Sequence, residues 1–161
     1  MTVYADNAAT TQMSDSVLKA MMPLLTDIYG NPSSLHSVGQ IAKEHLEAAR
    51  ETVAECIGAD PKEIYFTSGG SEADNQAIRS AAYIGARKGK KHIISSKFEH
   101  HAVLHTLDAL KKEGFTVTLL DVYSNGIVKP EDVANAITDE TCLVTIMTAN
   151  NEIGTIQPIA R

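Results

Sequence analysis

The sequence has no uninterrupted apolar run that approaches the roughly 18 residues of a membrane-spanning helix. Its first residues, Met1 to Asp6, also lack the basic region and the apolar stretch of an export signal. These absences argue against a membrane-bound or exported protein. The sequence therefore predicts a cytoplasmic location.

Positive charge and cysteine are also scarce. The chain has 14 Lys and Arg against 20 Asp and Glu, which gives a net charge of −6, so a nucleic-acid partner is not expected. The only cysteines are Cys56, in a helical pattern, and Cys142, in a β-rich run. Neither has a positive neighbour to lower the pKa of its thiol, and we expect both to be buried free thiols in a reducing compartment.

Hydrophobic spacing predicts alternating helices and short strands in a chain of 161 residues, which is long enough for one domain with a real core. The expected helices are 15–26, 37–57, 71–88, 98–113 and 130–138, and the expected strands are 63–66, 91–95, 115–121 and 141–147. Such alternation indicates right-handed crossovers and a parallel sheet. The predicted fold class is α/β, a mostly parallel sheet with helices on both faces.

Local signals support the first two helices. Ser14 is a plausible cap of the first helix, and Pro23 should bend it. Ser37 and Gln40 have the spacing of a capping box at the start of the second, which Gly58 should end.

A glycine-rich turn joins the predicted strand 63–66 to the helix after it. Residues 66–75 read FTSGGSEADN, so glycines, hydroxyls and the free amides of a new helix lie together, as in phosphate sites. A plain helix start, with Ser71 as cap and acids in the first turn, fits equally well. The turn lacks both the Gly-Lys-Ser/Thr of a Walker loop and the three spaced glycines of a dinucleotide fingerprint.

Two more loops should lie beside that turn, because the carboxyl ends of parallel strands meet at one edge of a sheet. The first, 95–100, contains His100, which could stack on an aromatic ligand or move protons. A solvent-exposed histidine at a helix start is the plain alternative. The other loop, 148–153, offers Asn150 and Asn151 as hydrogen-bonding groups, or is simply a turn. His101 and His105 are four residues apart, but no third ligand is in register, so no metal site is predicted.

Five segments in this order resemble the cysteine desulfurases of the NifS/IscS type, which are class V aminotransferases and pyridoxal-phosphate enzymes of fold type I. They are 4–11 (YADNAATT), 30–36 (GNPSSLH), 66–75, 99–100 (EH) and 150–154 (NNEIG). The resemblance covers the whole chain. It implies the N-terminal part of the large, cofactor-binding domain, with 1–14 as an N-terminal segment and 15–161 as an incomplete domain.

The resemblance also implies roles for single residues. Gly70 and Ser71 match the pair that binds the phosphate of the cofactor, pyridoxal 5'-phosphate. His100 matches the catalytic histidine that stacks on the pyridine ring, and Asn151 matches an asparagine beside that ring. The segments 7–11 and 31–36 match the border of the substrate pocket.

The resemblance further implies an activity that removes sulfur from L-cysteine, leaves L-alanine and an enzyme persulfide, and serves a sulfur-acceptor or scaffold protein from a homodimer. The family's Schiff-base lysine, its pyridine-binding aspartate and its persulfide cysteine follow the segment that 150–154 matches. Lys97 matches a lysine without the Schiff-base role and should be solvent-exposed. We therefore expect the 161-residue chain alone to be inactive and prone to self-association. Another class V aminotransferase or lyase, or a non-catalytic phosphate-binding or interaction module, is the alternative.

Overall fold

The computed structural model describes residues 2–160, which form two compact units. The first unit ends at Phe66 and the second begins at Thr67. The boundary predicted at residue 14 stays a prediction.

The first unit contains two helices whose bounds match the sequence prediction. They are α1, Asp15–Thr26, and α2, Ser37–Ile57, which ends at Gly58 in the left-handed conformation with φ of 67°. The capping box predicted for α2 is wrong. His36 is the N-cap, and its Nδ1 accepts a hydrogen bond from the Gly39 amide at 3.3 Å. The side chain of Gln40 donates to the Ser34 carbonyl and does not bond to the first residues of the helix, as a capping box would require.

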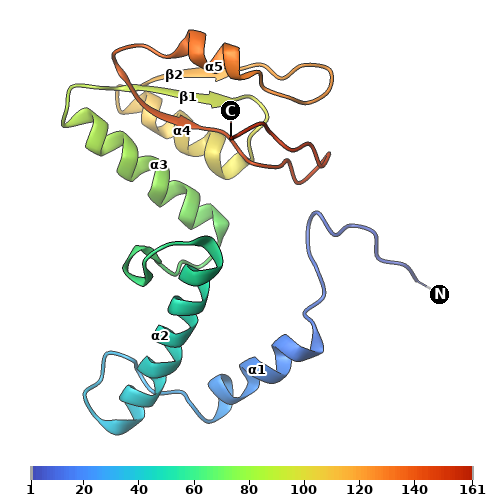
Figure 1. The fold of residues 1–161 in the computed structure, drawn as a ribbon, viewed down its shortest axis with the longest axis vertical. Helices are drawn as coiled ribbons and strands as arrows, with labels where there is room; N and C mark the ends of the chain where they lie inside the picture. The colour runs from blue at the N-terminus through green and yellow to red at the C-terminus, as the bar shows by residue number, and fades with distance from the viewer. Residues whose placement is uncertain (1, 161) are drawn as a thin grey trace. The chain divides into compact units, whose positions relative to one another are not determined.

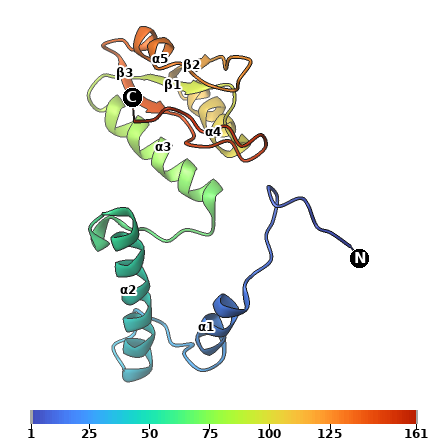
Figure 2. The same ribbon diagram turned by 45° about the vertical axis from the view of Figure 1, so that its right-hand side comes forward.

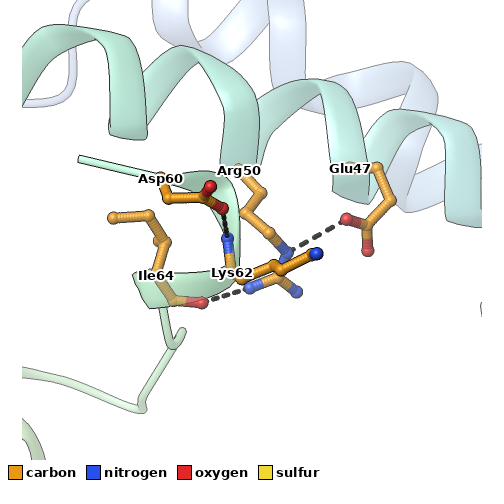
Figure 3. A network of polar contacts seen from close by, with 5 residues as sticks. All are labelled: Glu47, Arg50, Asp60, Lys62 and Ile64. Atoms are coloured by element: carbon orange, nitrogen blue, oxygen red, sulfur yellow. Dashed lines mark hydrogen bonds and ion pairs between the residues drawn. The ribbon is translucent and has the colours of Figure 1, made fainter. Parts of the chain in front are cut away.

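Arg50 on α2 organises the segment that follows this helix (Figure 3). Its guanidinium donates to Glu47 Oε2 at 3.2 Å and to the Ile64 carbonyl, and it lies 5.1 Å from the ring centroid of Phe66. Residues Pro61–Glu63 form a short 3-10 helix, η1, with Asp60 as its N-cap. The strand predicted over 63–66 is therefore wrong, because the Ile64 amide and carbonyl are bonded to the 3-10 turn and to Arg50 instead of a neighbouring strand.

The second unit is an α/β layer structure, as predicted. Its elements are α3 (Gly70–Ala86), β1 (His92–Ser96), α4 (His101–Lys112), β2 (Thr116–Leu120), α5 (Pro130–Ala136) and β3 (Thr141–Thr145). The three strands are parallel in the order β2-β1-β3. Figures 1 and 2 show α3 and α4 against one face of the sheet and α5 on the other.

The core of this unit lies between the sheet and the α3–α4 layer. Residues of α3, β1 and α4, together with the residue before β2, form one buried cluster: Ile78, Ala82, Ile93, Val103, Leu107, Leu110 and Phe115. The four-residue step from Val103 to Leu107 and the three-residue step to Leu110 place one face of α4 on the sheet. This packing fixes the start of α4, and with it His100, relative to β1.

The two cysteines differ in their surroundings. Cys56 on α2 is exposed, so the prediction that it is buried in the core is wrong. Cys142 on β3 is half-buried, and burial raises the pKa of its thiol. Cys142 therefore has little thiolate character at neutral pH.

Gly85 is the point of closest approach between α3 and β3, and replacing it by alanine should destabilise this unit. A Cβ at Gly85 would overlap the Cβ of Cys142 and lie 2.9 Å from its Sγ and 3.3 Å from the Lys90 carbonyl. The helix and the strand would have to separate, at a cost of about 1–3 kcal/mol, which urea denaturation measures.

The matched control for Gly85→Ala is Gly70→Ala in the first turn of the same helix. A Cβ at Gly70 would meet nothing within 4 Å. Gly70→Ala should therefore leave the free energy of unfolding unchanged or increase it. Equal losses in both variants would contradict the packing argument.

Candidate functional site

The loops after β1 and β3 are joined at the carboxyl edge of the sheet. The Asn150 side-chain amide donates to the Phe98 carbonyl at 3.1 Å, and the Met147 amide donates to Glu99 Oε1 at 2.9 Å. Both bonds connect one loop to the other, so the segments that carry His100 and Asn151 form one surface. Their expected convergence is confirmed.

The first turn of α3 lies at the same edge. Because α3 leads into β1 and packs across the sheet, its N-terminus is at the carboxyl end of the strands. The negative charge of Asp74, in the second turn of α3, also contributes to raising the pKa of Glu99. The third predicted loop therefore reaches the same rim.

The glycine turn presents free backbone amides. The first hydrogen bond of α3 runs from the Ala73 amide to the Gly69 carbonyl at 3.1 Å, so the amides of Gly70 and Ser71 have no partner inside the helix. A Cβ built at Gly69 or Gly70 meets no atom within 4 Å, and Ser71 is exposed. An open space faced by two amides, a hydroxyl and the positive end of a 17-residue helix suits a phosphate group.

His100 is the N-cap of α4. Its Nδ1 accepts a hydrogen bond from the Ala102 amide at 3.1 Å, so the neutral ring carries its proton on Nε2. The side chain is exposed. The cap therefore fixes one edge of the imidazole and leaves the Nε2 edge and the ring face for a ligand.

Glu99 is a buried acid that the sequence placed in the motif 99–100 without assigning it a role. The residue is 9% exposed, and its Oε1 accepts from Ser96 Oγ and from the Met147 amide, each at 2.9 Å. Burial raises the pKa of this carboxyl, and these two bonds only partly oppose the rise. The residue ties the β1 loop to the β3 loop immediately before His100.

The two adjacent asparagines have different roles. Asn150 is buried, and its Oδ1 accepts from the amides of Glu152 and Ile153 at 2.8 and 3.0 Å. Asn151 is exposed, and its side chain donates only to Glu152 Oε1, at 3.4 Å. Asn150 therefore shapes the loop, while Asn151 is the amide that can reach a ligand.

The remaining candidate groups are a lysine that pairs with an acid and two segments of the first unit. Lys97 is exposed as expected, and its Nζ pairs with Asp121 at 2.7 Å. The segments 7–11 and 31–36 belong to the first unit, and their predicted role at a substrate pocket stays a prediction. Among residues 2–160, no three His, Cys, Asp or Glu side chains are grouped so as to hold a metal ion, and no helix is long and apolar enough to cross a membrane.

Comparison with known proteins identifies the family. The sequence pattern of the family described as "Aminotransferase class-V" matches residues 3–161. The chain belongs to the class V aminotransferase family. It is also 55% identical over 157 residues to the cysteine desulfurase IscS of Clostridium botulinum, covering 98% of this chain and 39% of that protein.

Two solved structures are similar to the chain over nearly its whole length. A NifS-like protein superposes with a TM-score of 0.94 at 44% identity, over 99% of this chain and 43% of that one. The structure titled "SspA in complex with cysteine" gives a TM-score of 0.92 at 41% identity, over 98% of this chain and 45% of that one. This class V aminotransferase chain thus spans about two fifths of the length of its relatives.

Class V aminotransferases and cysteine desulfurases are pyridoxal-phosphate enzymes, and the rim fits that cofactor in two respects. The amides of Gly70 and Ser71 suit its phosphate, since they face open space at a helix N-terminus. The exposed imidazole of His100 suits its aromatic ring. Both groups lie in the second unit, on loops that the fold brings to one edge.

Proposed function

We propose that the protein carrying this chain is a pyridoxal-phosphate-dependent cysteine desulfurase. It would transfer the sulfur of L-cysteine to an enzyme thiol as a persulfide and release L-alanine. The 55% identity to a cysteine desulfurase over 98% of the chain carries this proposal. The cysteine in the complex with SspA, at 41% identity, supports L-cysteine as the substrate.

The chain would provide one wall of the cofactor site. Gly70 and Ser71 would bind the phosphate through backbone amides and the Ser71 hydroxyl, and Asn151 would donate a hydrogen bond beside the ring. His100 would stack on the pyridine ring with its Nδ1 held by the Ala102 amide. When bound, pyridoxal phosphate supplies the electron sink that makes bonds at the substrate's α-carbon breakable.

His100 would exchange protons with the substrate through one ring atom, Nε2. Because Nδ1 accepts from the Ala102 amide, Nε2 is the position at which the ring holds or releases a proton next to the substrate. Imidazole is the side chain that most often serves as a general acid or base in enzymes. The capped helix keeps Nε2 in place during turnover.

Residues outside 1–161 would supply the covalent chemistry of the whole enzyme. Lys97 is exposed and paired with Asp121, and burial disfavours the thiolate of Cys142, so neither suits the role of covalent anchor or persulfide carrier. A sulfur-acceptor protein and a homodimer, which the resemblance implies, and the cytoplasmic location predicted from the sequence complete the proposal.

The test is the reaction of the whole protein, loaded with pyridoxal phosphate, with L-cysteine in the presence of a thiol reductant. We expect alanine and sulfide in equal amounts, and none from the 161-residue chain alone. Amino transfer from cysteine to a 2-oxo acid without sulfide release would instead identify an aminotransferase of the same family. Alanine released by the isolated chain would overturn the assignment of the covalent residues to positions outside it.

A further inference from the structure

Glu72 closes the glycine turn through two hydrogen bonds to one residue. Its Oε2 accepts from the Ser68 amide at 2.7 Å and from the Ser68 hydroxyl at 2.6 Å. Ser68 precedes the glycine pair, and Glu72 lies in the first turn of α3. The carboxylate therefore bridges the two ends of the segment Gly69-Gly70-Ser71, whose amides face the rim.

This bridge adds to two restraints on the C-terminal side of the segment, the bond from the Ala73 amide to the Gly69 carbonyl at 3.1 Å and the bond from Asn75 Nδ2 to the Ser71 carbonyl at 2.9 Å. It is the contact that ties the segment to Ser68, on its N-terminal side. Two successive glycines have the largest backbone freedom to lose on ordering. Their Cβ positions are surrounded by open space, so no packed neighbour holds them. The other side-chain contact to the pair that the structure records is the bond from Thr67 Oγ1 to the Gly69 carbonyl, at 3.1 Å.

The charge of Glu72 does not itself favour a phosphate. The hydrogen bonds from Ser68 lower the pKa of its carboxyl, so the side chain is anionic at neutral pH. An anion beside a phosphate dianion is repulsive. The benefit of an acid at this position must therefore come from its geometry as a double acceptor.

We infer that Glu72 is a positioning residue for the phosphate of the cofactor, and that it acts by holding Ser68 so that the Gly70 and Ser71 amides converge on one point. The inference rests on the proposed function. If Glu72 positions the loop, glutamine at this position should preserve the function, because its neutral amide oxygen can also accept both hydrogen bonds from Ser68. Alanine, which has no acceptor, should not.

The experiment compares pyridoxal phosphate with pyridoxal, which lacks the phosphate, as ligands of the whole protein stripped of cofactor. Glu72→Ala should lower the affinity for pyridoxal phosphate by about tenfold, as expected for lost alignment of hydrogen-bond donors, and leave the affinity for pyridoxal unchanged. Glu72→Gln should retain the wild-type ratio of the two affinities or increase it. Absorbance titration measures both ligands without need of turnover.

Two further variants complete the set. Ser71→Ala removes a hydroxyl that touches the phosphate directly and should lower the same ratio. Glu131→Ala removes a first-turn acid from α5 and should leave the ratio unchanged. Amide hydrogen exchange at Ser68 should become faster in Glu72→Ala but not in Glu131→Ala, because only the former loses the acceptor of that amide.

The outcomes separate this inference from the proposed function. A wild-type protein that binds pyridoxal as tightly as pyridoxal phosphate would overturn the phosphate site itself. A wild-type preference for pyridoxal phosphate that survives in Glu72→Ala would leave that site standing and overturn the positioning role. A gain of affinity in both Glu72→Ala and Glu72→Gln would show that the carboxylate acts only by repulsion, which also overturns it.

Discussion

Replacing His100 by alanine should lower the turnover of L-cysteine by about 10²- to 10⁴-fold in the whole enzyme, which is the usual contribution of a positioned acid–base group. The variant loses the ring that is proposed to stack on the cofactor and the Nε2 atom that exchanges protons. It also loses the N-cap of α4, because the Ala102 amide no longer has its acceptor. The cap alone contributes about 1 kcal/mol to the free energy of unfolding.

His100→Asn separates these two roles. Asparagine is a strong N-cap residue and should preserve the bond from the Ala102 amide, so urea denaturation should give nearly wild-type stability. It has no imidazole, so turnover should fall as far as in the alanine variant. The rate of alanine release at saturating cysteine and cofactor measures the effect, and an asparagine variant as fast as the wild type would contradict the catalytic role.

The periodic parts of the fold were predictable because their signals are local. The spacing of Val103, Leu107 and Leu110 defines the buried face of α4 without knowledge of its partners. Gly58, in the left-handed conformation, ends α2 at the position that the sequence predicted. Alternation of such helices with short strands was sufficient to predict the parallel sheet.

Two errors, both in strand bounds, occurred where side chains from other segments capture backbone groups. The strand predicted over 63–66 fails because Arg50, from the preceding helix, takes the Ile64 carbonyl. The last predicted strand ends at Thr145, before its expected end at residue 147, because the Met147 amide bonds to Glu99 instead of a neighbouring strand. No local propensity encodes either contact.

The candidate site likewise contains residues whose roles the sequence predicted and residues whose roles it did not. His100 and Asn151 were identified by resemblance to family motifs, and they are exposed side chains on loops. Glu99 and Asn150 hold those loops together, but the sequence assigned Glu99 no role of its own within the motif 99–100 and left Asn150 as a hydrogen-bonding group or a turn residue. Their importance depends on burial, and burial at a loop follows from tertiary packing alone. A sequence motif therefore points to the groups proposed to touch a ligand before it points to those that position them.

Replacing Glu99 by alanine should destabilise the second unit by about 2–4 kcal/mol, since the Ser96 hydroxyl and the Met147 amide would both lose their acceptor in a buried place. The loops that carry His100 and Asn151 would keep the bond from Asn150 to the Phe98 carbonyl but lose the one from Met147 to Glu99, so their alignment would loosen and turnover in the whole enzyme should fall as well. Glu99→Gln is the matched control. Its amide oxygen can accept both bonds at the position of Oε1, and stability near that of the wild type is expected.

Glu99→Gln and the wild type should differ in how their stability depends on pH. Burial raises the pKa of Glu99 in the folded chain above its ordinary value of 4.5, so the folded state holds this proton more tightly than the unfolded state. The contribution of Glu99 to the free energy of unfolding of the wild type is therefore complete below pH 4.5. It is lost as the pH rises through the pKa that this carboxyl has in the folded state. Glutamine does not titrate. The difference in the free energy of unfolding, variant minus wild type, should therefore increase with pH across that window and then stay constant. A difference that decreases with pH would show that the hydrogen bonds from Ser96 and Met147 outweigh burial at this carboxyl.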